Sequence, residues 1–293
     1  MTLSLVYAWH SLHRWRRRWR WPLKAAFLVS VSLATLYPKF WLLPRWLARL
    51  GDFDRVVDPY DPALTKLEQR LSVLPSNADL RHVAAAIEKL VIEQIPYAFD
   101  WETWGVVDYL PTVAEVFARG REDCDGRAVV AASLLRRLGY QAQLVSDLKH
   151  TWVVATDPSA SQPQSIELMG PGAGEKTLSG DIGGTRTRLS IQTFGNLSRG
   201  LAFGIAVFPL ARELVLVGAL WLTLLHPRCS PRRAALAALL LLAGLLLCRA
   251  AGPSATATAQ RPVLLWCGLA SGLIGCTLLL AASASRRQGV EPG

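Results

Sequence analysis

The stretch GREDCDGRAVVAASLLRRLGYQAQLVS, residues 120–146, decides the fold of this chain. Its apolar residues recur at helical spacing from Cys124 onward, and Asp123 stands where a helix-capping side chain belongs. Gly139 ends the pattern, because glycine readily adopts the left-handed conformation that closes helices. Beyond it apolar and polar residues alternate, which predicts a strand over residues 141–146. The stretch therefore predicts a helix followed directly by a strand.

The sequence around this stretch predicts helices first and strands second. Helical spacing occurs upstream over residues 62–73, 78–94 and 112–119. Alternating patterns downstream predict strands over residues 150–156 and 164–169, joined by a hairpin loop. Residues 170–186 are rich in glycine and are expected to be irregular. The fold class expected for this region is α+β, with helices preceding an antiparallel sheet.

The apolar residues of the chain predict a membrane protein. Hydrophobic residues make up 51% of the 293 residues, a high share for a soluble protein. Apolar stretches predict about four transmembrane helices, over residues 25–38, 205–226, 234–251 and 263–283. The second stretch contains Arg212 and Glu213, which we expect near the outer end of the span, where arginine can extend to the interface.

The distribution of arginine residues predicts which of these segments face the cytoplasm. The clusters of arginine lie before the first span, between the second and third, and after the last, so these parts are expected in the cytoplasm. Residues 1–50 then form a basic N-terminus with the first span, residues 51–200 an extracytoplasmic domain, and residues 201–293 three spans with a short tail. We expect a multi-pass inner-membrane protein with a periplasmic domain. A cleaved signal peptide over residues 1–38 is the alternative, although no A-x-A site follows it.

The overall net charge of +10 is concentrated in the two membrane flanks. Residues 51–200 carry 15 Lys/Arg and 20 Asp/Glu, a net charge of −5. An acidic domain does not suit the phosphate backbone, so we expect no nucleic-acid partner.

Cys124 is the only one of five cysteines within residues 51–200, so this region has no internal disulfide. Its place at a helix N-terminus favours the thiolate, which is the reactive form, although the flanking acids oppose this effect. His150 opens a predicted strand and could accept the thiol proton. A hairpin centred near residues 158–159 would put Glu167 opposite His150, where a carboxylate can fix the imidazole tautomer. The candidate catalytic residues are Cys124, His150 and Glu167. A Cys–His pair without an acid is left open.

These motifs resemble the transglutaminase-like superfamily. The run from Gly120 to Gly139 is similar to its turn, cysteine and small-residue helix, and HTWV from His150 is similar to its histidine strand. WGVVDYLPT from Trp104 resembles a segment of bacterial transglutaminase-like cysteine proteinases, some of which are periplasmic and cleave surface adhesins. The resemblance covers about residues 78–170, and the acid departs from it, because the family normally has Asp where this chain offers Glu167.

The resemblance implies a papain-like, transglutaminase-like domain that is a cysteine protease or amidase acting on a protein or peptide substrate. It also implies that an aromatic residue such as Trp104 can help to form the oxyanion site. No cofactor is expected, with calcium at Asp123 and Asp125 as the alternative that some of these proteinases suggest. Two other functions stay open for this site: protein crosslinking, and an inactive binding or assembly module in a membrane complex whose partner is unknown. A transporter or channel formed by the C-terminal spans is a further, weaker reading.

Overall fold

The computed structural model describes Leu12 and residues 16–75, 78–147, 150–160, 165–170, 177–181, 184–187, 191–252 and 262–284. The chain divides into two compact units. The first comprises Met1–Pro38 with Leu201–Gly293, and the second comprises Lys39–Gly200. The predictions made for Arg14, for most of the loop 252–262 and for Arg286 and Arg287 lie outside the described residues.

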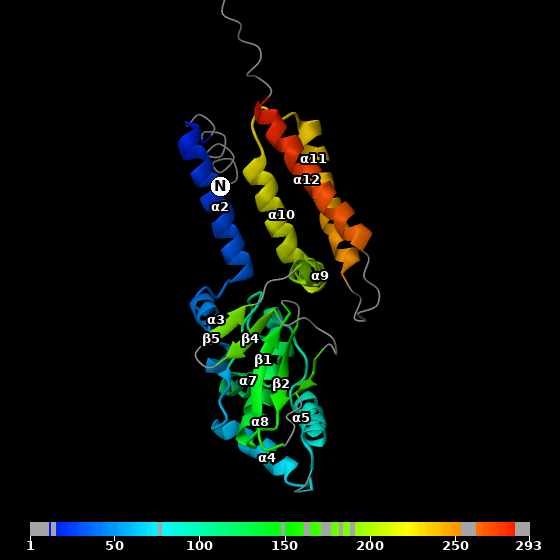
Figure 1. The fold of residues 1–293 in the computed structure, drawn as a ribbon. Coiled ribbons are helices and arrows are strands. Elements are labelled where there is room, and N and C mark those ends of the chain that lie inside the picture. Colours follow the sequence, from blue (N-terminus) through cyan, green and yellow to red (C-terminus); the bar gives the residue numbers. More distant parts are fainter. Residues whose placement is uncertain are drawn as a thin grey trace, which may run out of the picture. The chain divides into compact units, whose positions relative to one another are not determined.

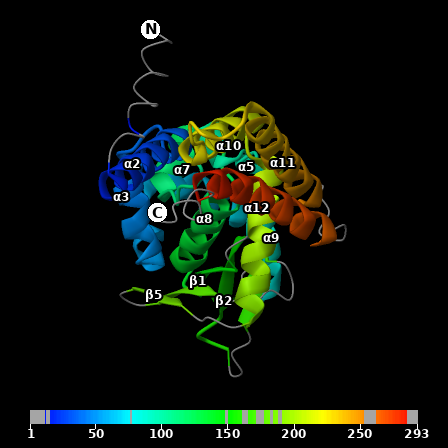
Figure 2. The same ribbon diagram turned by 90° about the horizontal axis from the view of Figure 1, so that it is seen from above.

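The first unit consists of helices (Figure 1). They are α2 (Arg17–Leu36), the end of α9 (Ile191–Val207), α10 (Leu210–Leu224), α11 (Pro231–Ala251) and α12 (Pro262–Ala284). Helix α2 packs beside α10, and α11 lies along α12 (Figures 1 and 2). A Cβ added to Gly244 would stand 2.7 Å from the Gly268 carbonyl oxygen. Glycine therefore allows α11 and α12 to approach this closely, as small residues do between membrane helices.

Two described helices are long and apolar enough to cross a membrane, Pro231–Ala251 and Val263–Ala281. A third candidate arises if Gly200–Val207 and Leu210–Leu224, which meet at a bend of 111°, count as one span. Helix α2 does not qualify, since its first turns carry several basic residues. Within the part of the chain that the structure describes, two helices are span-capable, or three if the bent pair is one span, and four spans remain a prediction.

Basic side chains hold both ends of α10. At its C-terminal end, Lys24 Nζ donates to the carbonyl oxygens of Thr223 (2.6 Å) and Leu225 (3.0 Å). At the bend before its N-terminal end, Arg249 donates to the Phe208 carbonyl (2.8 Å) and forms an ion pair with the buried carboxylate of Glu213. Carbonyl groups at the end of a helix have no hydrogen-bond donor within the helix, and here the two basic side chains supply donors. The partner of Glu213 is thus an arginine from another helix.

The second unit places its helices before its sheet, apart from residues 191–200 at the start of α9, and this agrees with the predicted α+β order. Its helices are α3 (Leu42–Leu50), the 3₁₀ turns η1 (Phe53–Val56) and η2 (Pro62–Leu64), α4 (Thr65–Leu71), α5 (Leu80–Gln94), α6 (Asp100–Thr103), α7 (Val113–Arg119) and α8 (Cys124–Arg137). Its strands are β1 (Gln141–Ser146), β2 (Thr151–Thr156), β3 (Ser165–Leu168), β4 (Leu178–Asp181) and β5 (Gly184–Thr187). The described strands form an antiparallel sheet in the order β3-β2-β1-β4-β5.

Helix α8 is the centre of the second unit and packs on β1 and β2 (Figures 1 and 2). The Asp123 carboxylate accepts the Asp125 N–H at its start, and Gly139 follows its end with a φ of 90°. Its residues from Ala128 to Leu135 are all buried, because small side chains let the helix lie against the sheet on one side and against α5 and α7 on others. The predicted helix, its N-cap residue Asp123 and the closing glycine Gly139 are confirmed.

Two predictions about this unit differ from the structure. The unit begins at Lys39 rather than residue 51, because α3 belongs to it: Arg49 pairs with Glu115 of α7 at 2.7 Å. Residues 170–186 were expected to be irregular, but their described part contains β4 and the start of β5. These strands form because β4 pairs with β1. The glycine-rich sequence alone does not indicate this pairing, since strand formation depends on the neighbouring strand.

Candidate active site

Cys124 is the first residue of α8, so its side chain lies at the positive end of the helix dipole. Helix α8 packs on β2, and the backbone N–H of Thr151, the first residue of β2, is close enough to the sulfur to lower the pKa of the thiol. Helix and sheet thereby bring together Cys124 and the strand that follows His150. The other described histidine of this unit, His82, is exposed and contacts Asp79 at the start of α5 (2.6 Å).

The thiol form of Cys124 is favoured, although the helix dipole favours the thiolate. Cys124 is partly exposed as a residue, but burial of its thiol is the largest cause that raises its pKa well above the ordinary value. Nearby carboxylates, that of Asp123 foremost, raise the pKa further, and the Thr151 N–H opposes them. The thiolate bias that the helix terminus provides is therefore outweighed, because burial and the neighbouring acids together raise the pKa of the thiol.

His150 has a defined orientation. Its Nε2 lies 2.7 Å from the carbonyl oxygen of Met169, and its ring stacks on Trp152 with centroids 6.2 Å apart. A carbonyl can only accept a hydrogen bond, so Nε2 carries the proton and Nδ1 of the neutral ring is the acceptor. The backbone N–H of His150 also donates to Asp147 (2.8 Å). The imidazole therefore has one nitrogen fixed as a donor and the other suited to accept a proton.

The register that led to Glu167 is wrong. In the β2–β3 ladder, Glu167 lies opposite Val154 and not opposite His150. The hairpin turn is centred further along the chain than residues 158–159, so each β3 residue pairs further along β2. The geometric reason for choosing Glu167 as the acid partner of His150 therefore fails.

Met169 supplies the contact that was expected from an acid, and no side-chain pattern could have revealed it. This residue has a φ of 56°, in the left-handed region that non-glycine residues rarely adopt. Gly170 follows, and a Cβ there would stand 2.9 Å from both Glu167 Oε2 and Trp152 Cδ1. The turn after β3 is therefore specified by glycine, and it places the Met169 carbonyl on the imidazole. Strain of this kind is common at functional sites.

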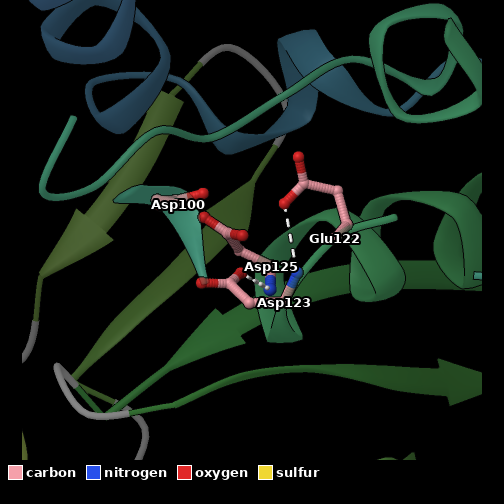
Figure 3. Close-up of side chains that lie close together, drawn as sticks. All are labelled: Asp100, Glu122, Asp123 and Asp125. Carbon is pink, nitrogen blue, oxygen red and sulfur yellow. Dashed lines mark hydrogen bonds between the residues drawn. The ribbon is translucent and has the colours of Figure 1, made fainter. Parts of the chain in front are cut away.

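Four acids gather at the start of α8 (Figure 3). One carboxylate oxygen from each lies within 4.8 Å of the others. The four are Asp100, Glu122, Asp123 and Asp125. Burial is the largest cause that raises the pKa of Asp100 and Asp125 well above the usual range, and the Asp123 carboxylate raises both further. Asp100 Oδ2 accepts the Tyr109 N–H (2.7 Å), whereas Oδ1 is buried without a hydrogen-bond partner among the described residues.

Glu122 is fully buried beside the helix start and joins the site to Trp104. It accepts hydrogen bonds from the indole Nε1–H of Trp104 and, at 3.1 Å, from the Asp123 N–H. Burial raises the pKa of Glu122 to about 8. Gly126, one helical turn further, leaves the space that this side chain occupies. The indole N–H of Trp104, expected as a candidate for the oxyanion site, is therefore engaged by a carboxyl group.

Comparison with known proteins identifies no relative. No family model, curated protein or solved structure matches this chain.

Proposed function

We propose that this chain is a membrane-anchored, transglutaminase-like cysteine hydrolase with a papain-like domain, a protease or amidase that acts on a protein or peptide substrate. The observation that carries the proposal is the link between Cys124 and the histidine strand. Helix α8, which Cys124 opens, packs on β2, and His150 directly precedes β2 with its Nε2 hydrogen-bonded to the Met169 carbonyl. This combination supports a nucleophile next to an oriented base.

The proposed reaction is acyl transfer. His150 Nδ1 accepts the thiol proton, and the Cys124 sulfur attacks an amide carbonyl to form a tetrahedral intermediate. The Cys124 backbone N–H helps to hold the oxyanion, as an N–H at a helix start can. The imidazolium then gives its proton to the leaving amine, which leaves a thioester. Water hydrolyses the thioester to the acid, while an amine acceptor in place of water would produce a crosslink.

The acid cluster fits a calcium ion, which the family resemblance suggests. Calcium prefers six to eight oxygen ligands, and here several carboxylates converge while a buried oxygen of Asp100 lacks a hydrogen bond. Asp100, Asp123 and Asp125 would hold the ion, and water would complete its shell. When bound, the ion would supply positive charge beside Cys124 and so lower the pKa of its thiol.

One observation favours the second candidate function, an inactive binding or assembly module. The raised pKa of Cys124 keeps the nucleophile as a thiol at neutral pH in the absence of a neighbouring cation. A module without catalysis would retain the fold but would not couple His150 to the thiol.

Alkylation of Cys124 by iodoacetamide distinguishes these two functions. We expect His150→Ala to slow alkylation at pH 7.5 by at least tenfold, because the variant cannot accept the thiol proton. His82→Ala is the matched control, since this histidine is exposed and lies outside the site, and it should react as the wild type does. Equal rates in the wild type and His150→Ala would support the binding module and contradict the hydrolase.

The proposed location is the inner membrane, with the second unit in the periplasm. The two span-capable helices and the arginine-rich segments flanking them support this location. Reaction of single-cysteine variants with a membrane-impermeant thiol reagent in spheroplasts tests it. A cysteine introduced at Tyr60 should react, because this side chain is 88% exposed, and its protection until lysis would contradict the proposed orientation.

A further inference from the structure

An extended segment, residues 96–99, runs beside the start of α8. The Glu122 N–H donates to the Pro96 carbonyl at 3.1 Å, and the Ala98 N–H donates to the Glu122 carbonyl at 3.2 Å. These bonds make a parallel bridge between Tyr97 and Glu122. Tyr97 therefore lies opposite Glu122, and Glu122 precedes Cys124 by two residues in the sequence.

The other edge of this segment is open at Tyr97. The two bonds of this bridge are made by Pro96 and Ala98, the residues on either side of Tyr97. In a parallel bridge the N–H and C=O of the residue between them point away from the partner strand. Within the described residues, neither group of Tyr97 has a hydrogen-bond partner. Its side chain is also 49% exposed. An unpaired donor and acceptor on an extended edge can pair with the backbone of an added strand.

Three aromatic rings line this segment, and we name them the aromatic strip: Tyr97, Phe99 and Trp101. Tyr97 meets Phe99 edge to face at 5.4 Å, and Phe99 stacks on Trp101 at 4.3 Å. Ala98 between them is buried, as the alternation of an extended chain requires. The Tyr97 ring is also near enough to Cys124 for the two groups to affect each other electrostatically. The aromatic strip is therefore partly exposed, and Tyr97, over whose ring the Arg127 guanidinium lies at 5.2 Å, pairs with the residue two positions before the candidate nucleophile.

We propose that the open edge of Tyr97 and the aromatic strip form a subsite for the acyl donor. The donor binds as an extended polypeptide whose backbone pairs with the N–H and C=O of Tyr97, while an aromatic or large apolar side chain packs on the strip. This inference rests on the proposed function, since it assigns the substrate class of the same site. It makes Tyr97 a specificity-determining residue rather than a catalytic one.

The test measures alkylation of Cys124 in the full chain in detergent, by mass spectrometry of the peptide that contains it. The probes are acetyl-tripeptidyl chloromethyl ketones, in which the thiolate displaces chloride: an all-alanine probe and three in which Phe replaces each alanine in turn. We expect one Phe position to react about three to ten times faster than alanine, which corresponds to about 0.7–1.4 kcal/mol and lies within the range of an aromatic contact. N-methylation at that position should remove the advantage, because it blocks pairing with Tyr97.

Variants assign the preference to the strip. Tyr97→Ala keeps the backbone edge but removes the ring, so the Phe preference should fall to about twofold or less. Tyr60→Ala is the matched control, because it removes an exposed tyrosine elsewhere in the same unit, and it should keep the full preference. Because removal of the ring changes the surroundings of Cys124, the preference is taken as the ratio of the Phe and alanine probe rates within each variant, and a cooperative urea transition shows that Tyr97→Ala is still folded.

The outcomes separate this inference from the proposed function. Absence of any Phe preference in the wild type, or its persistence in Tyr97→Ala, overturns the subsite. Failure of the proposed function has a different signature, namely iodoacetamide rates that do not depend on His150. Because chloromethyl ketones alkylate a thiol without needing catalysis, the side-chain preference is measured in either case.

Discussion

Glu122→Gln should lower the stability of the protein at acidic pH and raise it at basic pH. Glu122 is fully buried, and burial raises its pKa from 4.5 to about 8. A carboxyl group with a raised pKa in the folded state binds its proton more tightly there than in the unfolded chain. Its contribution to stability is therefore complete below pH 4.5 and is lost as the pH rises to about 8. Glutamine does not ionise, so the variant lacks this loss.

The magnitude follows from the two pKa values. Between pH 5 and pH 8 the wild type should lose about 4 kcal/mol relative to the variant, at about 1.36 kcal/mol per pH unit. At pH 5 the variant should be less stable by about 1 kcal/mol, because glutamine has one acceptor oxygen for the two N–H donors, of Trp104 and Asp123, that the two oxygens of Glu122 accept. The two stability curves should therefore cross between these pH values.

The assay is urea unfolding of the full chain in detergent with EDTA, followed by tryptophan fluorescence. Comparing the variant with the wild type at each pH cancels the titration of acids far from Glu122. The Glu122 carboxylate raises the pKa of Asp100, so its removal in the variant changes the difference in the same direction. A stability difference that stays constant from pH 5 to pH 8 would refute the reasoning, because it would mean that Glu122 has the same pKa in both states.

Three further predictions concern packing, calcium and the membrane unit. Gly126→Ala should lower the free energy of unfolding by about 1–2 kcal/mol, because its Cβ would stand 2.8 Å from the Glu122 Cβ. This crowding exceeds the gain in helix propensity. An unchanged urea midpoint would contradict the prediction. Calcium at 100 times its Kd should stabilise the EDTA-treated protein by about 2.7 kcal/mol, and an equal rise in thermal midpoint in Asp100→Asn would exclude this site. Arg249→Gln should cost about 3–5 kcal/mol because it leaves Glu213 buried without its ion-pair partner. Adding Glu213→Gln should recover part of this loss in a thermal melt, and no recovery would count against the pairing.

The helix and strand at the centre of the second unit were predictable because local signals agree. Asp123 caps α8, Gly139 closes it, and the change to alternating apolar residues begins at β1. Each signal acts within a few residues, so tertiary contacts reinforce it without altering it.

The partner of His150 was not predictable, because it depends on a turn and on a backbone group. A shift of the hairpin centre moves Glu167 opposite Val154, and sequence spacing does not fix such a register. The Met169 carbonyl leaves no signature in the side-chain sequence. The adjacent Gly170 was the available signal, since a glycine after a strand often marks an unusual turn or a close approach.

The electrostatic balance at Cys124 also required the structure. The sequence shows acids on both sides of the cysteine, but Asp100 comes from a different helix and reaches the site only through the fold. Burial is a further property of the folded state, and it contributes most to the raised pKa.

The second unit is inserted into the first, and this connectivity affects how the protein responds to cleavage. The chain leaves the first unit after Pro38 and returns at Leu201. A single proteolytic nick in the inserted unit would give an N-terminal fragment that contains α2 and a C-terminal fragment that contains α10 to α12. Because Lys24 of α2 caps the end of α10, the two fragments would remain joined without a covalent link. Shedding of the inserted unit therefore requires two cuts, one near each of its ends.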